Sequence, residues 1–225
     1  MQTQAYPCCT MHRFDRPPRK SSVKHVMRDA SNTVSVVAIV PAAGRSGRMG
    51  TPKQLLDVDG KPMLLGVVEA LLCGGVSSVI VVANSAIREA LAAFPKGVTV
   101  AVNDEPRTEM IDSVRIGLAS APAADGYLVC PSDAARLCAV DVHRCLDTFR
   151  SAPDQIVIGT HDGRRGHPMI FPGSLAEVVR SRECDAGLNQ MSRNRPHLVR
   201  EVACASPATI ANVNTPADYE KLTEA

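Results

Sequence analysis

Val34-Ser-Val-Val-Ala-Ile-Val-Pro41 runs directly into Ala42-Ala-Gly-Arg-Ser-Gly-Arg-Met-Gly-Thr-Pro-Lys-Gln-Leu-Leu56. The β-branched apolar run predicts a strand that is buried on both faces. The small residues that follow allow the backbone to approach a ligand and turn its N–H groups toward an anion. Arg45, Arg48 and Lys53 add positive charge, so we interpret this segment as an anion-binding loop suited to a triphosphate. The alternative is a basic, flexible surface loop.

The loop matches neither of the two common phosphate-binding motifs. It lacks the G-x-G-x-x-G spacing of dinucleotide-binding turns and the G-x-x-x-x-G-K-[ST] spacing of the P-loop. The spacing of the loop residues alone therefore does not identify the ligand, and motifs in the rest of the chain are needed to identify it.

Strand and helix patterns alternate after this loop. Helices are predicted at 63–74, 85–94, 109–120 and 139–150, and strands at 78–83, 98–102 and 126–130. This alternation predicts an α/β protein with three layers: a doubly wound, mainly parallel sheet between helices. Ligands of such sheets bind at the carboxyl ends of the strands, which directs attention to the segments after residues 41, 83, 102 and 130.

Asp133 follows the predicted strand at 126–130 and is our predicted metal ligand. A divalent cation on phosphate oxygens needs hard oxygen donors, usually carboxylates and water. An aspartate after a strand also commonly caps a helix, which is the alternative interpretation of Asp133.

Composition divides the chain into two parts. Residues 1–33 carry six Lys or Arg against two Asp and show no sustained hydrophobic period, so we expect a disordered basic tail before one domain at 34–225. The near-neutral remainder and an aromatic content of 3% argue against nucleic-acid binding. No apolar run is long enough to span a bilayer, and we expect a cytoplasmic protein. Cys73, Cys130, Cys145 and Cys204 lie in or beside apolar segments and are expected to be buried, reduced thiols.

The motif A-A-G-x-S-x-R-M-G-x-P-K-x-L-L after the first strand resembles the signature of the MobA-like NTP-transferase superfamily. It looks most like the molybdenum cofactor cytidylyltransferases, and its P-K-Q triplet also resembles the isoprenoid-pathway cytidylyltransferases. The resemblance implies a Rossmann-like nucleotidyltransferase fold and triphosphate contacts for Arg48 and Lys53. The nucleotide-binding residues that it implies are Ala42, Ala43, Gly44, Arg45, Ser46, Gly47, Arg48, Lys53 and Ser113. By the same resemblance, Ala43 implies CTP as the favoured donor.

Later segments carry the same resemblance. Asp133-Ala-Ala-Arg136 is similar to the isoprenoid D-A-A-R-P, which supports Asp133 as a metal ligand. Ala211-Asn-Val-Asn-Thr-Pro-Ala-Asp218 resembles the family's D-I-D-T-P-E-D and N-x-N-T-P-E-D endings and makes Asn214 a second metal candidate. Thr215 and Pro216 are alternatively only the start of the last helix.

The predicted acceptor half contains the segment 161–171, which resembles the G-x-x-G-H-P of molybdenum cofactor nucleotidyltransferases. Cys184-Asp-Ala-Gly187 resembles their later G-D-x-G-A. The resemblance therefore implies acceptor contacts from His167, Arg165 and Asp185. Each of them could also be an ordinary surface or packing residue.

The combined expectation is a Mg²⁺-dependent nucleotidyltransferase, with Mn²⁺ as a possible substitute. An NTP, with CTP favoured, would donate its nucleoside monophosphate to a phosphorylated small molecule and release pyrophosphate, with Arg48, Lys53 and Asp133 as catalytic residues. Molybdopterin or its molybdenum form is the preferred acceptor, with a molybdoenzyme or chaperone as a conceivable protein partner. The alternatives are methylerythritol phosphate, a sugar phosphate, and a non-catalytic factor that binds or inserts the molybdenum cofactor.

Overall fold

The computed structural model describes residues 34–44, 49–91 and 93–224. A seven-stranded sheet of order β5-β4-β1-β6-β8-β7-β9 forms its centre. The strands are β1 (Val36–Pro41), β4 (Ser78–Ala83), β5 (Val98–Val102), β6 (Gly126–Val129), β7 (Ile156–His161), β8 (Arg164–Pro172) and β9 (Val199–Ala203). The predicted tail at 1–33 lies outside the described residues.

The sheet is mainly parallel, as the alternation predicts. β1 pairs in parallel with β4 and with β6, β4 with β5, and β7 with β9. β8 runs antiparallel to both of its neighbours. The chain moves from β1 outward through β4 to β5 and then returns to the other side of β1 as β6. The strand order therefore reverses between β1 and β6, the type of position at which open α/β sheets bind ligands.

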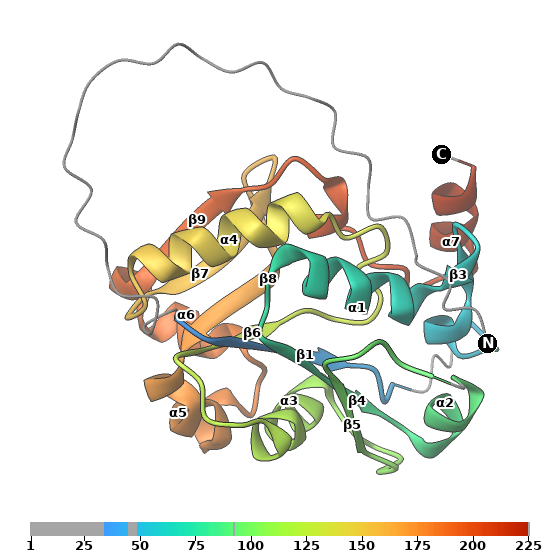
Figure 1. Cartoon of the computed structure of the whole chain (residues 1–225), viewed down its shortest axis with the longest axis horizontal. Helices are drawn as coiled ribbons and strands as arrows, with labels where there is room; N and C mark the ends of the chain where they lie inside the picture. The colour runs from blue at the N-terminus through green and yellow to red at the C-terminus, as the bar shows by residue number, and fades with distance from the viewer. Residues whose placement is uncertain (1–33, 45–48, 92, 225) are drawn as a thin grey trace. The chain divides into compact units, whose positions relative to one another are not determined.

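Helices cover both faces of the sheet (Figure 1). They are α1 (Met63–Gly74), α2 (Ser85–Ala90), α3 (Met110–Ser120), α4 (Ala139–Ser151), α5 (Ala176–Arg180), α6 (Asn189–Asn194) and α7 (Pro216–Thr223). α1 and α4 lie on one face, whereas α3 and α5 lie on the other. Within the described ranges, no helix has both the length and the apolarity needed to cross a bilayer.

β1 shows why the layers form. Val36, Ala38 and Val40 belong to the core beneath α1 and α4, and Val37 and Ile39 belong to the core beneath α3, α5 and α6. Successive side chains of a strand point to opposite faces, so a continuously apolar strand is stable only between two helical layers.

Two details differ from the sequence prediction. The helix expected at 85–94 ends at Ala90, because Leu91 adopts an extended conformation and buries its side chain in the core. Cys73 is exposed on α1, whereas Cys130, Cys145 and Cys204 are buried as expected. The helices at 63–74 and 110–120 and the strands at 78–83 and 98–102 confirm the prediction closely.

Helix α3 packs so tightly on β1 that Gly117 has no room for a side chain. A Cβ atom there would lie 2.4 Å from Cγ2 of Ile39, which is fully buried. We expect Gly117→Ala to lower the free energy of unfolding by about 1–3 kcal/mol through overpacking. Urea unfolding followed by circular dichroism measures the change.

Gly66 in α1 is the matched control. A Cβ atom there would meet only the Lys61 side chain, at 3.9 Å. Gly66→Ala should therefore stabilise the protein by about 0.5–1 kcal/mol, the usual gain from replacing a helical glycine. Equal effects of the two substitutions would contradict the packing argument.

Candidate functional site

A pocket of about 430 Å³ opens at the carboxyl ends of β1, β4 and β5. Its lining residues come from the segments that directly follow these strands: Ala43, Gly44, Pro52, Asn84, Ser85, Ala86, Asn103, Asp104 and Glu105. The structure thus places a cavity where the sheet topology predicts one. Of the predicted nucleotide-binding residues, Ala43 and Gly44 line it, and Ala42 is buried beside them.

Four of the predicted nucleotide-binding residues belong to the central part of the loop. Arg45, Ser46, Gly47 and Arg48 lie outside the described residues. Their nucleotide-binding roles, and the triphosphate contact of Arg48, therefore remain predictions.

Lys53 joins two segments that are distant in the sequence. Its Nζ donates to Oδ2 of Asp133 at 2.5 Å and to Oδ1 of Asn214 at 3.0 Å. Lys53 begins the short 3₁₀ helix η1 (Lys53–Leu55), Asp133 follows β6, and Asn214 precedes α7. Because one ammonium group contacts both oxygens, three predicted site residues converge on a single point.

Asp133 does not cap a helix, because α4 begins only at Ala139. Its side chain is 10% exposed, and Oδ2 is neutralised by Lys53. Its Oδ1 is buried and makes no hydrogen bond to any described residue. A buried carboxylate oxygen without a donor is costly and is suited to a cation or an ordered water.

The local structure around Asn214 holds that residue in place. The Asp218 carboxylate accepts hydrogen bonds from the N–H groups of Asn214 and Thr215, at 3.0 and 2.8 Å. These bonds, the one from Asn214 first, lower the pKa of Asp218. Thr215 caps α7 and Pro216 occupies its first turn, as the sequence predicts for the start of the last helix.

The residues present fit a divalent cation only in part. Asp133 and Asn214 offer a carboxylate and an amide oxygen, both hard donors of the kind that Mg²⁺ binds. Among the described residues, however, no group of three His, Cys, Asp or Glu side chains is arranged to hold a metal ion. Any cation here would take most of its remaining ligands from phosphate oxygens and water.

His167, one of the predicted acceptor residues, interacts electrostatically with Asp133. It lies on β8, and its Nδ1 is buried without a hydrogen-bond partner among the described residues. Burial lowers the pKa of His167 because it disfavours the charged imidazolium, while the nearby Asp133 carboxylate acts in the opposite direction. Asp133 also adds to the effect of burial in raising the pKa of the Cys130 thiol.

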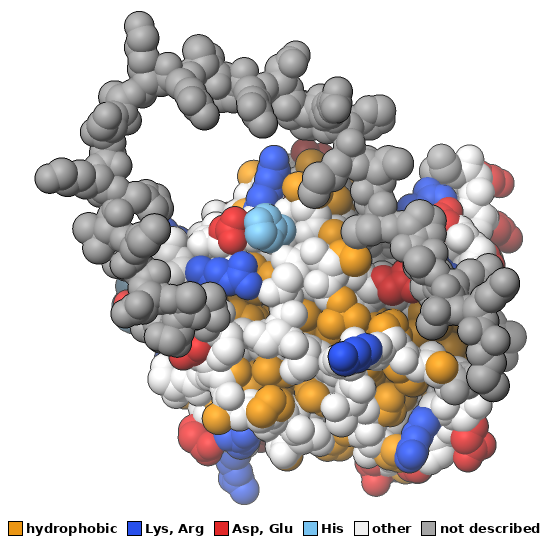
Figure 2. Space-filling view, viewed as in Figure 1, with side chains coloured by type: hydrophobic (Ala, Val, Ile, Leu, Met, Phe, Trp, Pro, Cys, Tyr) orange, Lys and Arg blue, Asp and Glu red, His pale blue; other side chains and the backbone are white. Residues whose placement is uncertain are grey.

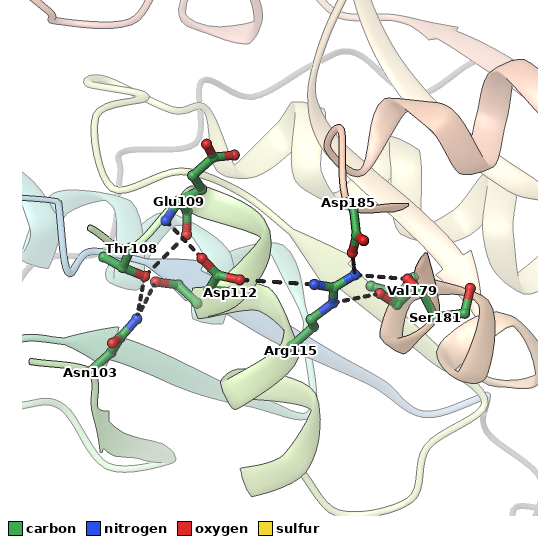
Figure 3. Close-up of polar contacts among 9 residues, drawn as sticks. Asn103, Thr108, Glu109, Asp112, Arg115, Val179, Ser181 and Asp185 are labelled. Atoms are coloured by element: carbon green, nitrogen blue, oxygen red, sulfur yellow. Dashed lines mark hydrogen bonds and ion pairs between the residues drawn. The ribbon is translucent and has the colours of Figure 1, made fainter. Parts of the chain in front are cut away.

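The other two predicted acceptor residues are engaged elsewhere. Asp185 accepts a hydrogen bond from Arg115 at 2.6 Å, and Arg115 also donates to the carbonyl oxygens of Val179 and Ser181 (Figure 3). Arg165 pairs with Glu201 of β9 at 2.7 Å, and both side chains are exposed. Of the three predicted acceptor residues, His167 is near enough to Asp133 for the carboxylate to affect its pKa. Asp185 and Arg165 instead form ion pairs with Arg115 and Glu201.

Ser113 lies behind the pocket. It is 2% exposed, and its Oγ accepts a hydrogen bond from Nδ2 of Asn103 at 3.2 Å. Asn103 also donates to Thr108, which lies just before the start of α3 (Figure 3). The N-cap of α3 is Glu109, whose N–H donates to Asp112. Ser113 thus supports Asn103, which itself lines the pocket, and a direct ligand contact of Ser113 stays a prediction.

Several site residues are absent from the sequence prediction. Asn84, Asn103 and Asp104 line the pocket, and Asp104 accepts from the N–H and hydroxyl of Ser85, at 2.8 and 2.7 Å. Gln54 is buried behind the loop and binds its carbonyl groups. Their position directly after strands 78–83 and 98–102, or after Lys53, is the signal that could have identified them.

Basic residues are scattered on the face drawn in Figure 2. Lys and Arg side chains lie singly among acidic and uncharged ones there, and the described residues form no continuous basic track on that face. The candidate site consists of the pocket and of the contacts that Lys53 makes with Asp133 and Asn214.

Comparison with solved structures supports the fold assignment. The crystal structure of Rv0371c from Mycobacterium tuberculosis H37Rv superposes with a TM-score of 0.76 at 26% sequence identity, covering 86% of this chain and 100% of that one.

Three curated proteins of similar sequence are named as three different enzymes. A 2-C-methyl-D-erythritol 4-phosphate cytidylyltransferase from Nocardia farcinica is 47% identical over 116 residues, which span 49% of this chain and about half, 48%, of the relative. Nicotine blue oxidoreductase from Paenarthrobacter nicotinovorans is 30% identical, covering 80% of this chain and 92% of the relative. A protein named "Probable molybdenum cofactor guanylyltransferase" from Rhodopirellula baltica is 30% identical, covering 81% of this chain and 89% of the relative.

Residues 38–201 match the MobA-like NTP transferase domain, and this segment includes most of β1, the pocket, Lys53, Asp133 and His167. The match takes in most of the chain, and the arrangement of the site is consistent with it. The protein therefore belongs to the MobA-like NTP transferase family.

Proposed function

We propose that this protein transfers a nucleoside monophosphate from an NTP to a phosphorylated small molecule and releases pyrophosphate. The observation that carries the proposal is the convergence of Lys53, Asp133 and Asn214 on one point. Lys53 directly follows Pro52, which lines the pocket. One relative is named as an oxidoreductase, so family membership alone does not specify the reaction. A cation and two hard oxygen donors beside an open pocket suit phosphoryl chemistry, which depends mainly on positioning and charge.

In the proposed reaction, an acceptor phosphate oxygen attacks the α-phosphorus in line with the departing pyrophosphate. Lys53 compensates Asp133 in the free protein and donates to phosphate oxygens when the nucleotide is bound. The backbone of Ala43 and Gly44 orients the nucleotide in the pocket. The chain needs no covalent nucleophile for such a transfer.

Asp133 and Asn214 are the residues that would hold a divalent cation, Mg²⁺ or Mn²⁺. Such an ion supplies charge neutralisation at the phosphate oxygens when bound. The partnerless Oδ1 of Asp133 supports this assignment, since it is available for another cationic contact.

We favour CTP as donor and molybdopterin or its molybdenum form as acceptor. The similarity to the guanylyltransferase relative extends over 89% of that protein, and so includes the acceptor half that contains His167. The match with the methylerythritol phosphate enzyme is higher in identity but spans 48% of it, which makes methylerythritol phosphate the second acceptor to test.

The direct test is pyrophosphate release with Mg²⁺, each of the four NTPs, and either acceptor. We expect turnover with CTP and molybdopterin, and a fall of about 100-fold or more in kcat/KM for Asp133→Asn, which keeps shape but removes charge. Gln155→Asn, in the loop before β7, is a control that should leave the rate unchanged. Absence of pyrophosphate with every combination would overturn the proposal.

Asn214→Asp tests the second cation ligand. A carboxylate adds negative charge at an oxygen that already faces Lys53, so Mn²⁺ should bind about tenfold more tightly. Electron paramagnetic resonance titration of free Mn²⁺ measures the affinity. Unchanged affinity in Asn214→Asp, with Asp133→Asn also unchanged, would place the cation elsewhere.

The pair of Lys53 and Asp133 also makes a prediction on stability. Lys53→Met leaves the 10%-exposed Asp133 side chain without its ammonium partner and should cost about 1–3 kcal/mol in the free energy of unfolding. Adding Asp133→Asn should restore part of that loss, because the uncompensated charge disappears. Additive effects in urea unfolding of the single and double variants would show that the pair is not coupled.

A further inference from the structure

The carbonyl groups of three successive residues just after β1 accept hydrogen bonds from side-chain amides. Nε2 of Gln54 donates to the carbonyl oxygens of Ala42 and Gly44, each at 2.8 Å. Nδ2 of Asn84 donates to the carbonyl oxygen between them, that of Ala43, at 3.3 Å. Gln54 is 1% exposed, so both bonds of its amide group are made inside the protein.

These contacts determine where the loop's N–H groups point. The peptide bonds here are trans, and in a trans peptide the N–H lies opposite the carbonyl group. The N–H of Ala43 is therefore turned away from Gln54, and the N–H of Gly44 is turned away from Asn84. Within the described ranges, neither N–H has a hydrogen-bond acceptor, although Ala43 is only 3% exposed and both residues line the pocket. A buried N–H without a partner is rare and calls for an acceptor.

The side-chain chemistry is specific to amides. Gln54 must supply two N–H donors without bringing a charge into a buried position, which an amide does and a carboxylate or thioether does not. Asn84 must present both ends of its amide, because its Oδ1 accepts from the N–H of Ile87 at 2.9 Å and caps α2. These two partners also fix which way the Asn84 amide faces.

We infer that Gln54 and Asn84 are positioning residues for nucleotide binding. They hold the peptide groups of Ala42 to Gly44 so that the N–H groups of Ala43 and Gly44 face an oxygen of the bound nucleotide. Gln54 does this from a buried position outside the pocket lining, whereas Asn84 also lines the pocket. The inference rests on the proposed function, since it assumes that the pocket takes a nucleotide. Its energetic basis is preorganisation: a loop already held in its binding geometry loses less conformational entropy when the ligand arrives.

Gln54→Met tests the inference, because it keeps the length of the side chain and removes both donors. We expect the Kd for CTP, measured by calorimetry with Mg²⁺ present, to rise about tenfold, with KM rising and kcat changing less. In wild-type protein, CTP should shift the amide resonances of Ala43 and Gly44 in ¹⁵N correlation spectra. In Gln54→Met these shifts should shrink. Gln155→Met, the same exchange at the opposite end of the sheet, should match the wild type in all three measurements.

Asn84→Ser provides a second, independent variant if Gln54→Met does not fold. Serine still caps α2 but is too short to reach the Ala43 carbonyl as well, so CTP affinity should fall while thermal stability stays close to that of the wild type. Failure of the wild type to bind ATP, CTP, GTP or UTP would overturn the proposed function. Wild-type binding together with unchanged Kd and amide shifts in the folded variants would overturn the positioning role alone.

Discussion

The central position of β1 is the constraint on which the site depends. β1 is hydrogen-bonded on both edges, to β4 and to β6, and is buried on both faces. A strand with no free edge and no solvent-exposed face leaves its carboxyl end as the place where the chain can meet a ligand. Because the strand order reverses beside it, the loops after β1, β4, β5 and β6 all reach the same edge of the sheet.

The ion pair between Lys53 and Asp133 joins two segments of the candidate site. Asp133 is largely buried and would be unfavourable without a cation, and Lys53 supplies one from a segment 80 residues away in the sequence. The same ammonium group reaches Asn214, 161 residues from Lys53. One ammonium group therefore joins the segment after β1, the segment after β6 and the start of α7.

Neutral amides organise the loop beside this ionic contact. Gln54 is adjacent to Lys53 in η1, so a single short turn carries both the cation for Asp133 and the donors for the Ala42 and Gly44 carbonyls. A displacement of η1 would disturb both contacts together. This turn thus links the geometry of the loop carbonyls to that of the Lys53–Asp133 pair.

The amino-acid sequence by itself determined the layer order and the edge of the sheet that carries the site. The apolar run at 36–41, the regular alternation of strands and helices, and the position of Asp133 after a strand all depend on local periodicity, which short stretches encode. Only the tertiary structure decided that Asp185 pairs with Arg115, that Ser113 accepts from Asn103, and that Gln54 donates to two carbonyl groups of the loop. The first contact joins residues 70 positions apart, and the others join residues 10 or 12 positions apart across a turn of the chain. In each case side-chain direction and burial choose among several chemically suitable partners, and the periodicity of a single strand or helix does not record that choice.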